Sequence, residues 1–124
     1  MSRKVAVVED NPDNRMLVQA LLEDQYEISE YESGVQAVEG LVDDGPDLIL
    51  LDISLPEMDG TEVLAWIREQ DGLESVPVIA LTAHAMAGDR EKYLAAGFND
   101  YVTKPIVDED VLIAAIERWL TPTD

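Results

Sequence analysis

The sequence predicts an α/β fold in which a doubly wound, five-stranded parallel sheet carries helices on both faces. Short apolar runs, typical of strands buried on both faces, alternate with longer segments whose apolar residues recur at helical spacing. The chain has 124 residues, which is about one domain, and this alternation uses nearly all of them. We therefore expect a single domain over residues 1–124, with right-handed crossovers between its parallel strands.

The first strand is predicted at residues 5–8, "VAVV". A helix should follow from Asn11 and Pro12, because asparagine is a good helix cap and proline is favoured at the first helical position. The residues expected to face the core from this helix are Leu17, Ala20 and Leu21.

A second strand is predicted at residues 26–31, where "YEISEY" alternates. The next helix should begin at Ser33, because Gln36 follows at capping-box spacing, and it should end at Gly45. The residues expected to face the core from this helix are Val35, Val38, Leu41 and Val42.

The rest of the chain repeats the alternation. The predicted strands are residues 48–51, 76–81 and 100–103, and the predicted helices begin after Gly60 and span residues 87–97 and 108–120. The residues expected to face the core are Val63, Leu64 and Ile67 in the first of these helices, and Val111, Leu112, Ala115, Ile116 and Trp119 in the last. We interpret Trp66 and Trp119 as packing residues, against the core or a partner.

Composition narrows the function classes. Acidic residues number 27 against 8 basic ones, a formal charge of -19, which argues against direct nucleic-acid binding. The absence of cysteine removes disulfides and thiolate metal sites, and no apolar run approaches the ~18 residues of a membrane span. We expect a cytoplasmic protein without membrane insertion. The acidic excess is typical of a solvated surface and also suits a protein that works in high salt.

Polar residues follow four of the five predicted strands. Glu9 and Asp10 follow the first, Asp52 the third, Thr82 the fourth and Lys104 the fifth. Ligands of open parallel sheets bind at this edge, where the carboxyl ends of the strands meet. Three converging carboxylates repel one another unless a cation intervenes, and oxygen ligands suit Mg²⁺.

A phosphoryl group would complete such a site, because Mg²⁺ is commonly bound together with phosphate oxygens. The hydroxyl of Thr82 and the ammonium of Lys104 suit phosphoryl oxygens, which leaves Asp52 as the candidate nucleophile. A strand buried on both faces would hold this carboxylate rigidly, while Pro56 and Gly60 turn the chain away and keep it accessible.

Four segments together resemble the receiver domains of two-component response regulators, over essentially the whole chain. They are "VVEDNPDNR", "DLILLDISLPEMDG", "VIALTAHA" and "AGFNDYVTKPI". The resemblance implies the flavodoxin-like strand order 2-1-3-4-5. It also implies that Asp52 takes a phosphoryl group from the phosphohistidine of a histidine kinase or histidine phosphotransfer protein. A change in the surface of the fourth helix, fifth strand and fifth helix would then regulate a downstream protein, which the sequence does not identify.

The resemblance also implies roles for site residues. Glu9, Asp10, Asp52 and the backbone carbonyl of Ser54 would hold Mg²⁺, which Mn²⁺ can replace. Glu9 stands where the family often has aspartate, and its extra methylene favours contact with the metal through water. Further residues with implied roles are Thr82 and Lys104 at the phosphoryl oxygens, Thr82 and Tyr101 as the switch, Lys104 and Pro105 as a cis peptide, and Ser54 and His84 as modulators of hydrolysis.

Other interpretations of these residues stay open. Glu9 and Asp10 are also typical of acidic residues near a helix start, and the lone His84 is typical of an inert loop histidine. No separate small-molecule turnover is expected, although the domain would assist its own phosphorylation and dephosphorylation. The chain would be either a stand-alone receiver or one excised from a hybrid histidine kinase.

Other functions fit the sequence less well than the receiver interpretation, because a purely structural interaction module would not need site residues at four strand ends. Residues 57–61, "EMDGT", resemble part of the D-x-D-G-T signature of haloacid dehalogenase-type phosphatases. Their nucleophile should end a buried strand, yet the strand here ends at Asp52 and Glu57 replaces the first signature aspartate. A flavodoxin-type flavin carrier is disfavoured, because no loop rich in Ser, Thr and Gly follows the first strand.

Overall fold

The computed structural model describes residues 3–53, 55, 60–82, 89–103 and 109–120. Five strands alternate with five helices in this part of the chain, as predicted. The strands are β1 (Arg3–Val8), β2 (Tyr26–Tyr31), β3 (Leu48–Asp52), β4 (Val78–Thr82) and β5 (Asp100–Thr103). The helices are α1 (Pro12–Leu22), α2 (Gly34–Asp44), α3 (Gly60–Arg68), α4 (Asp89–Ala96) and α5 (Glu109–Trp119).

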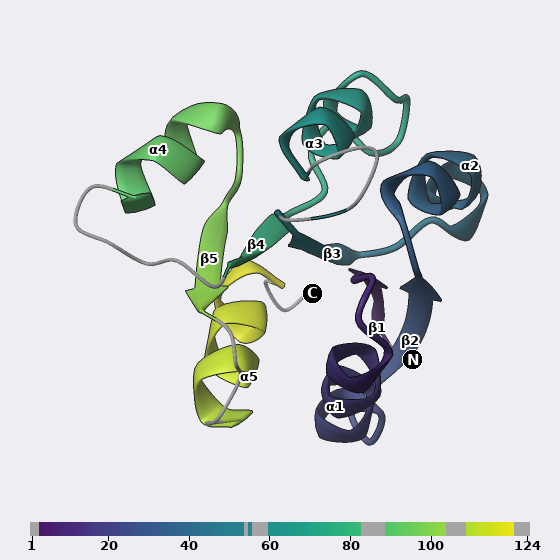
Figure 1. The fold of residues 1–124 in the computed structure, drawn as a ribbon, viewed down its shortest axis with the longest axis vertical. Helices are drawn as coiled ribbons and strands as arrows, with labels where there is room; N and C mark the ends of the chain where they lie inside the picture. Colours follow the sequence, from purple (N-terminus) through teal and green to yellow (C-terminus); the bar gives the residue numbers. More distant parts are fainter. Residues whose placement is uncertain (1–2, 54, 56–59, 83–88, 104–108, 121–124) are drawn as a thin grey trace.

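The strands form one parallel sheet in the order β2-β1-β3-β4-β5, which confirms the predicted topology. Helices α1 and α5 cover one face, and α2, α3 and α4 cover the other (Figure 1). Each face has its own apolar core, and β3 and β4 are buried along their whole length. This double cover explains why the central strands read as continuous apolar runs.

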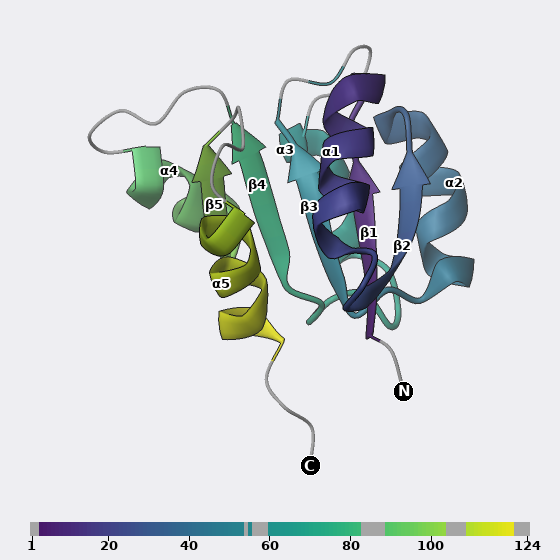
Figure 2. The same ribbon diagram turned by 90° about the horizontal axis from the view of Figure 1, so that it is seen from below.

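The register places the candidate site at one edge of the sheet. Val8 pairs with Leu51 across β1 and β3, and Asp52 pairs with Leu81 across β3 and β4. The strands run in the same direction, so their carboxyl ends meet at one edge (Figure 2). Glu9, Asp52 and Thr82 therefore follow or end three adjacent strands.

The predicted caps of the first two helices are confirmed. The Asn11 side chain accepts hydrogen bonds from the backbone N–H groups of Asp13 (2.8 Å) and Asn14 (3.3 Å) at the start of α1. Ser33 caps α2 by accepting a bond from the Gln36 N–H at 3.1 Å. Gly45 ends α2 with φ 61°, the left-handed conformation that glycine adopts without steric cost.

The predicted inner face of α1 is wrong by one residue. This helix buries Val18 and Leu22, while Leu17 is exposed and Leu21 only partly buried. Arg15 stands on the same face as Val18 and Leu22, at a spacing of i, i+3 and i+7, and it is bonded to the backbone at the end of β1. The apolar residues of this helix fit two neighbouring faces, and the observed one places Arg15 against the end of β1. Ala20, the other residue expected inside, is exposed.

Two other helices also differ in part from the predicted faces. In α2, Leu41 is buried and Val38 partly buried, but Val35 and Val42 are exposed, and the small Ala37 contacts the sheet instead. In α5 the face is as predicted except for Val111, which is exposed. The prediction for α3 is confirmed, with all three apolar residues buried.

The two tryptophans and the lengths of the helices are further features of the fold. Trp66 and Trp119 are partly buried and pack against the two cores, one on each face of the sheet. Within the described ranges, every helix is too short or too polar to cross a bilayer.

Candidate functional site

Three carboxylates meet at the carboxyl edge of the sheet. One oxygen of each of Glu9, Asp10 and Asp52 lies within 4.8 Å of the others. Glu9 is 0% and Asp52 1% exposed, whereas Asp10 is open to solvent. Negative groups this close are stabilised by a bound cation, and an oxygen-only ligand set suits a hard divalent ion. The arrangement fits a metal reached from the side of Asp10.

Glu9 is held by the start of α1. Its carboxylate accepts hydrogen bonds from the Asn11 N–H (3.2 Å) and the Asn14 side-chain amide (3.5 Å). Its own N–H donates to the Tyr31 carbonyl on β2 at 3.0 Å. Glu9 thus contacts the helix start, as the alternative interpretation expects, and also lies in the carboxylate cluster. A carboxylate offers about four lone-pair sites, so the two roles are compatible.

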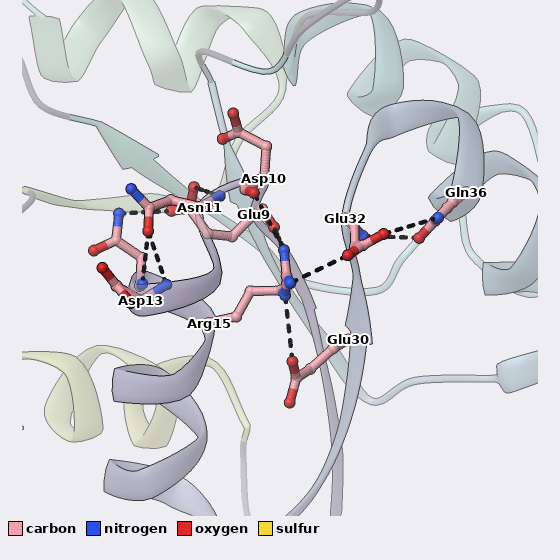
Figure 3. Close-up of polar contacts among 9 residues, drawn as sticks. Glu9, Asp10, Asn11, Asp13, Arg15, Glu30, Glu32 and Gln36 are labelled. Atoms are coloured by element: carbon pink, nitrogen blue, oxygen red, sulfur yellow. Dashed lines mark hydrogen bonds and ion pairs between the residues drawn. The ribbon is translucent and has the colours of Figure 1, made fainter.

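Arg15 braces the backbone of the acidic pair (Figure 3). Its guanidinium donates to the carbonyls of Glu9 (2.9 Å) and Asp10 (3.3 Å) and lies 3.4 Å from the Glu30 carboxylate and 3.3 Å from that of Glu32. Only 13% of the Arg15 side chain is exposed. Sequence reasoning missed this residue, although an arginine on the first helix of so acidic a chain was the available signal.

The backbone of Asp52 and Ile53 packs closely against the backbone of Gly60 at the start of α3. The Ile53 N–H donates to the Leu81 carbonyl (3.1 Å), and the Gly60 N–H donates to the Ile53 carbonyl (3.0 Å). A Cβ at Gly60 would lie 2.7 Å from the Asp52 carbonyl oxygen and 2.7 Å from the Ile53 Cα. Glycine is therefore required where α3 begins against the backbone of the candidate nucleophile.

Thr82 and Tyr101, the predicted switch pair, are joined by a third residue. Thr82 is 3% exposed, and its hydroxyl lies 3.2 Å from that of Tyr93, a residue of α4 that is 7% exposed. The ring of Tyr93 lies 5.8 Å from that of Tyr101, which is partly buried on β5. Sequence reasoning missed Tyr93, and an aromatic residue within a weakly amphipathic helix was the signal for it.

Several predicted site residues lie outside the described part of the chain. They are Ser54, His84, Lys104 and Pro105, so their implied roles and the cis peptide stay predictions. Residues 57–59 of the dehalogenase-like motif lie there as well.

Known proteins with similar sequences include a response regulator and a histidine-protein kinase. The chain is 43% identical over 107 residues to the polar-differentiation response regulator DivK of Brucella ovis, covering 86% of this chain and 87% of DivK. It is 47% identical over 110 residues to the signal transduction histidine-protein kinase BarA of Escherichia coli, covering 88% of this chain. The matched region spans only 12% of the length of BarA.

Solved structures share the fold. The receiver domain of the sensor histidine kinase PA1611 from Pseudomonas aeruginosa, which has magnesium in its active site cleft, matches with a TM-score of 0.87 and 39% identity. This match covers 97% of the present chain and 98% of the other. The chemotaxis protein CheY4 of Vibrio cholerae matches with a TM-score of 0.89 and 26% identity, covering 97% and 100% of the two chains.

The strand order, the carboxylate cluster at the edge of the sheet and these likenesses agree with one another. The family model described as the response regulator receiver domain matches residues 5–117, nearly the whole chain. The protein therefore belongs to the response regulator receiver domain family of two-component signalling, whose members are phosphoacceptor signalling domains and not small-molecule enzymes.

Proposed function

We propose that this domain is a switch in which Asp52 accepts a phosphoryl group from the phosphohistidine of a histidine kinase or histidine phosphotransfer protein. The supporting observation is the convergence of Asp52 with Glu9 and Asp10 at the strand ends. In the transfer, an Asp52 carboxylate oxygen forms the new P–O bond while the P–N bond breaks. The histidine nitrogen keeps that electron pair and takes up a proton.

Magnesium is the cofactor in this proposal, and Mn²⁺ can replace it. Glu9, Asp10 and Asp52 would hold it, together with the Ser54 backbone carbonyl that the family resemblance implies. When bound, the ion neutralises negative charge on the phosphoryl oxygens. The buried end of β3 keeps the Asp52 carboxylate in a fixed position, which limits the entropy lost on reaching the transition state.

The remaining roles concern the phosphoryl oxygens and the output. Thr82 and Lys104 donate to those oxygens, and Ser54 and His84 modulate hydrolysis of the acyl phosphate. With these residues the domain assists its own phosphorylation and dephosphorylation. Phosphorylation shifts Thr82 and Tyr101 and changes the surface of α4, β5 and α5, where a downstream protein binds.

Intact-mass measurement tests the proposal. With Mg²⁺ and a phosphorylated histidine kinase, or a small acyl-phosphate donor, the protein should gain one phosphoryl group that is acid-stable and base-labile. Asp52→Asn should abolish this gain, because the amide is not a nucleophile toward phosphorus. Asp43→Asn makes the same chemical change at an exposed position of α2 and should be labelled like the wild type. Full labelling of the Asp52→Asn variant would place the phosphoacceptor elsewhere.

A further inference from the structure

Thr82 and Tyr93 form a buried pair of hydroxyl groups. Their oxygens lie 3.2 Å apart, and both side chains are nearly inaccessible to solvent. Each hydroxyl has one proton to donate and lone pairs to accept. A buried hydroxyl that loses its partner is costly, because water cannot replace the bond. The pair therefore restrains the position of the Thr82 side chain.

Tyr93 also connects α4 to the sheet. It is the buried residue of α4 within residues 91–96, where the other side chains are exposed or only slightly covered. Its ring lies edge-on to Phe98, with centroids 6.2 Å apart and an interplanar angle of 87°, and is tilted against Tyr101 at 5.8 Å. A displacement of the Tyr93 hydroxyl should consequently displace the Tyr101 ring and α4, which carry or contact the Tyr93 ring.

The order of the strands in the sheet indicates in which direction the Thr82 hydroxyl moves on phosphorylation. Strand β4, which ends at Thr82, lies between β3, which carries Asp52, and β5, which carries Tyr101. Tyr93 packs against Tyr101 on the β5 side. A Thr82 hydroxyl that turns toward a phosphoryl group on Asp52 must therefore turn away from Tyr93.

We propose that Tyr93 is a positioning residue of the switch, which holds the Thr82 hydroxyl in the unphosphorylated state and passes its displacement to Tyr101 and α4. This inference rests on the function proposed above. Either hydroxyl can be the donor in this bond, and a Thr82 hydroxyl that moves toward the phosphoryl group moves out of bonding distance of Tyr93, so breaking the Thr82–Tyr93 bond is part of switching. A ligand shifts such an equilibrium only through contacts that differ between the two states, and this bond is one of them.

Tyr93→Phe tests the role of this bond because it keeps the ring and removes the hydroxyl. The probe is beryllofluoride with Mg²⁺, an analogue of the phosphoryl group on Asp52, and its dissociation constant is measured by calorimetry. The variant loses a bond present only in the unphosphorylated state, so it should bind the analogue about two- to tenfold more tightly than wild type. Unchanged or weaker binding would overturn the inference.

Two matched variants test whether the change in analogue affinity comes from loss of the Thr82–Tyr93 bond and not from loss of any tyrosine hydroxyl. Tyr31→Phe also removes a bonded phenol hydroxyl, which donates to Asp44 at 3.0 Å beside the opposite outer strand, β2, and it should leave analogue affinity unchanged. In a Thr82→Val background, Tyr93→Phe should have no further effect on affinity, because the bond is already absent. A persistent effect in that background would show that Tyr93 acts independently of Thr82, against the inference.

Aromatic NMR of the wild-type protein supplies a test without substitution. The ring resonances of both Tyr93 and Tyr101 should shift when the analogue binds, and a Tyr93 ring that does not respond would refute the relay. Failure of the proposed phosphoacceptor function and failure of the Tyr93 inference give different results. A wild-type protein that is not phosphorylated at Asp52 and does not bind the analogue would overturn both proposals. Normal Asp52 phosphorylation with an inert Tyr93 would overturn this one alone.

Discussion

Glu9 and Asp10 are neighbours in the sequence and differ sharply in environment. The Glu9 carboxylate is buried and already accepts bonds from Asn11 and Asn14, whereas Asp10 is exposed beside it. An acid whose oxygens are engaged in this way suits contact with a metal through water, while the exposed acid is available for direct ligation. The two residues should therefore contribute differently to metal binding.

We expect Asp10→Ala to weaken Mg²⁺ binding more than Glu9→Ala, in a titration followed by calorimetry. Loss of a residue that acts through water costs about tenfold in affinity, and loss of a direct ligand costs more. Asp13→Ala removes an exposed acid on the first turn of α1 and should change the affinity little. Equal losses at Glu9 and Asp10 would show that both ligate the metal in the same way.

The candidate residues at strand ends were predictable from the sequence, while their supporting residues were not. Asp52 and Thr82 directly end apolar runs, so the strand pattern alone brings them to one edge. Arg15 and Tyr93 act through bonds to residues on other elements, and those bonds depend on helix rotation and on the meeting of distant segments. Local periodicity carries no information about such contacts.

At the scale of elements, the start of α3 sets the backbone that leaves Asp52. Gly60→Ala places a methyl group against backbone atoms that cannot rotate away. We expect the free energy of unfolding to fall by about 2 kcal/mol, measured by urea denaturation. Because the displaced atoms belong to Asp52 and Ile53, Mg²⁺ affinity should fall as well.

Gly45→Ala is the matched control for this substitution. Gly45 has φ 61° at the end of α2, and a methyl group there would meet no described atom within 4 Å. Its cost should come from the left-handed backbone alone, about 1 kcal/mol, without loss of Mg²⁺ affinity. Normal metal binding by Gly60→Ala would contradict the coupling of α3 to the site.

A polar cluster joins β1, β2 and α2 beside the outer strand β2. The Asp44 carboxylate accepts bonds from Lys4 (3.0 Å), Ser29 (3.1 Å) and Tyr31 (3.0 Å). Burial raises the pKa of Asp44, but the three hydrogen bonds and the positive charge of Lys4 together outweigh it and leave the pKa below its usual value. Burial, followed by the bond to Asp44, raises the pKa of Tyr31 to about 12.

The raised pKa of Tyr31 predicts a loss of stability in alkali. The folded protein keeps the Tyr31 proton up to about pH 12, whereas the unfolded chain releases it near pH 10.0. The contribution of this group is therefore complete below pH 10.0 and disappears as the pH rises through 12. Urea denaturation of wild type and Tyr31→Phe over this range should give a shallower decline in the variant. Parallel declines would show that Tyr31 does not contribute to the loss.

The order and type of the elements followed from the sequence, but the faces of the helices followed only in part. Alternating apolar runs and the caps at Asn11, Ser33 and Gly45 predicted the strands and helices. The inner face of α1 differs by one residue from the predicted one, and α2 packs the small Ala37 against the core where larger valines were expected. In short helices with many scattered apolar residues, several faces satisfy the same pattern.

At the scale of the whole molecule, the formal charge of -19 opposes compactness. Added NaCl should raise the thermal midpoint, because the Debye length falls from about 30 Å at 0.01 M to about 3 Å at 1 M. Salt also weakens exposed ion pairs such as Lys4 with Glu27 (3.3 Å), but pairs of this kind contribute at most about 1 kcal/mol each. Calorimetry against an uncharged osmolyte of equal osmolality provides the measurement. A midpoint that falls with salt would show that ion pairs outweigh the repulsion.

The placement of the tryptophans gives the molecule two independent optical reporters. The chain contains 2 of them. Trp66 packs on the core beneath α2, α3 and α4, and Trp119 packs on the core beneath α1 and α5, where its indole N–H donates to Asp100 at 3.1 Å. Replacing either one by phenylalanine leaves a protein whose fluorescence reports a single layer of helices. Emission spectra of the two variants can therefore distinguish loosening of one face of the sheet from loosening of the other.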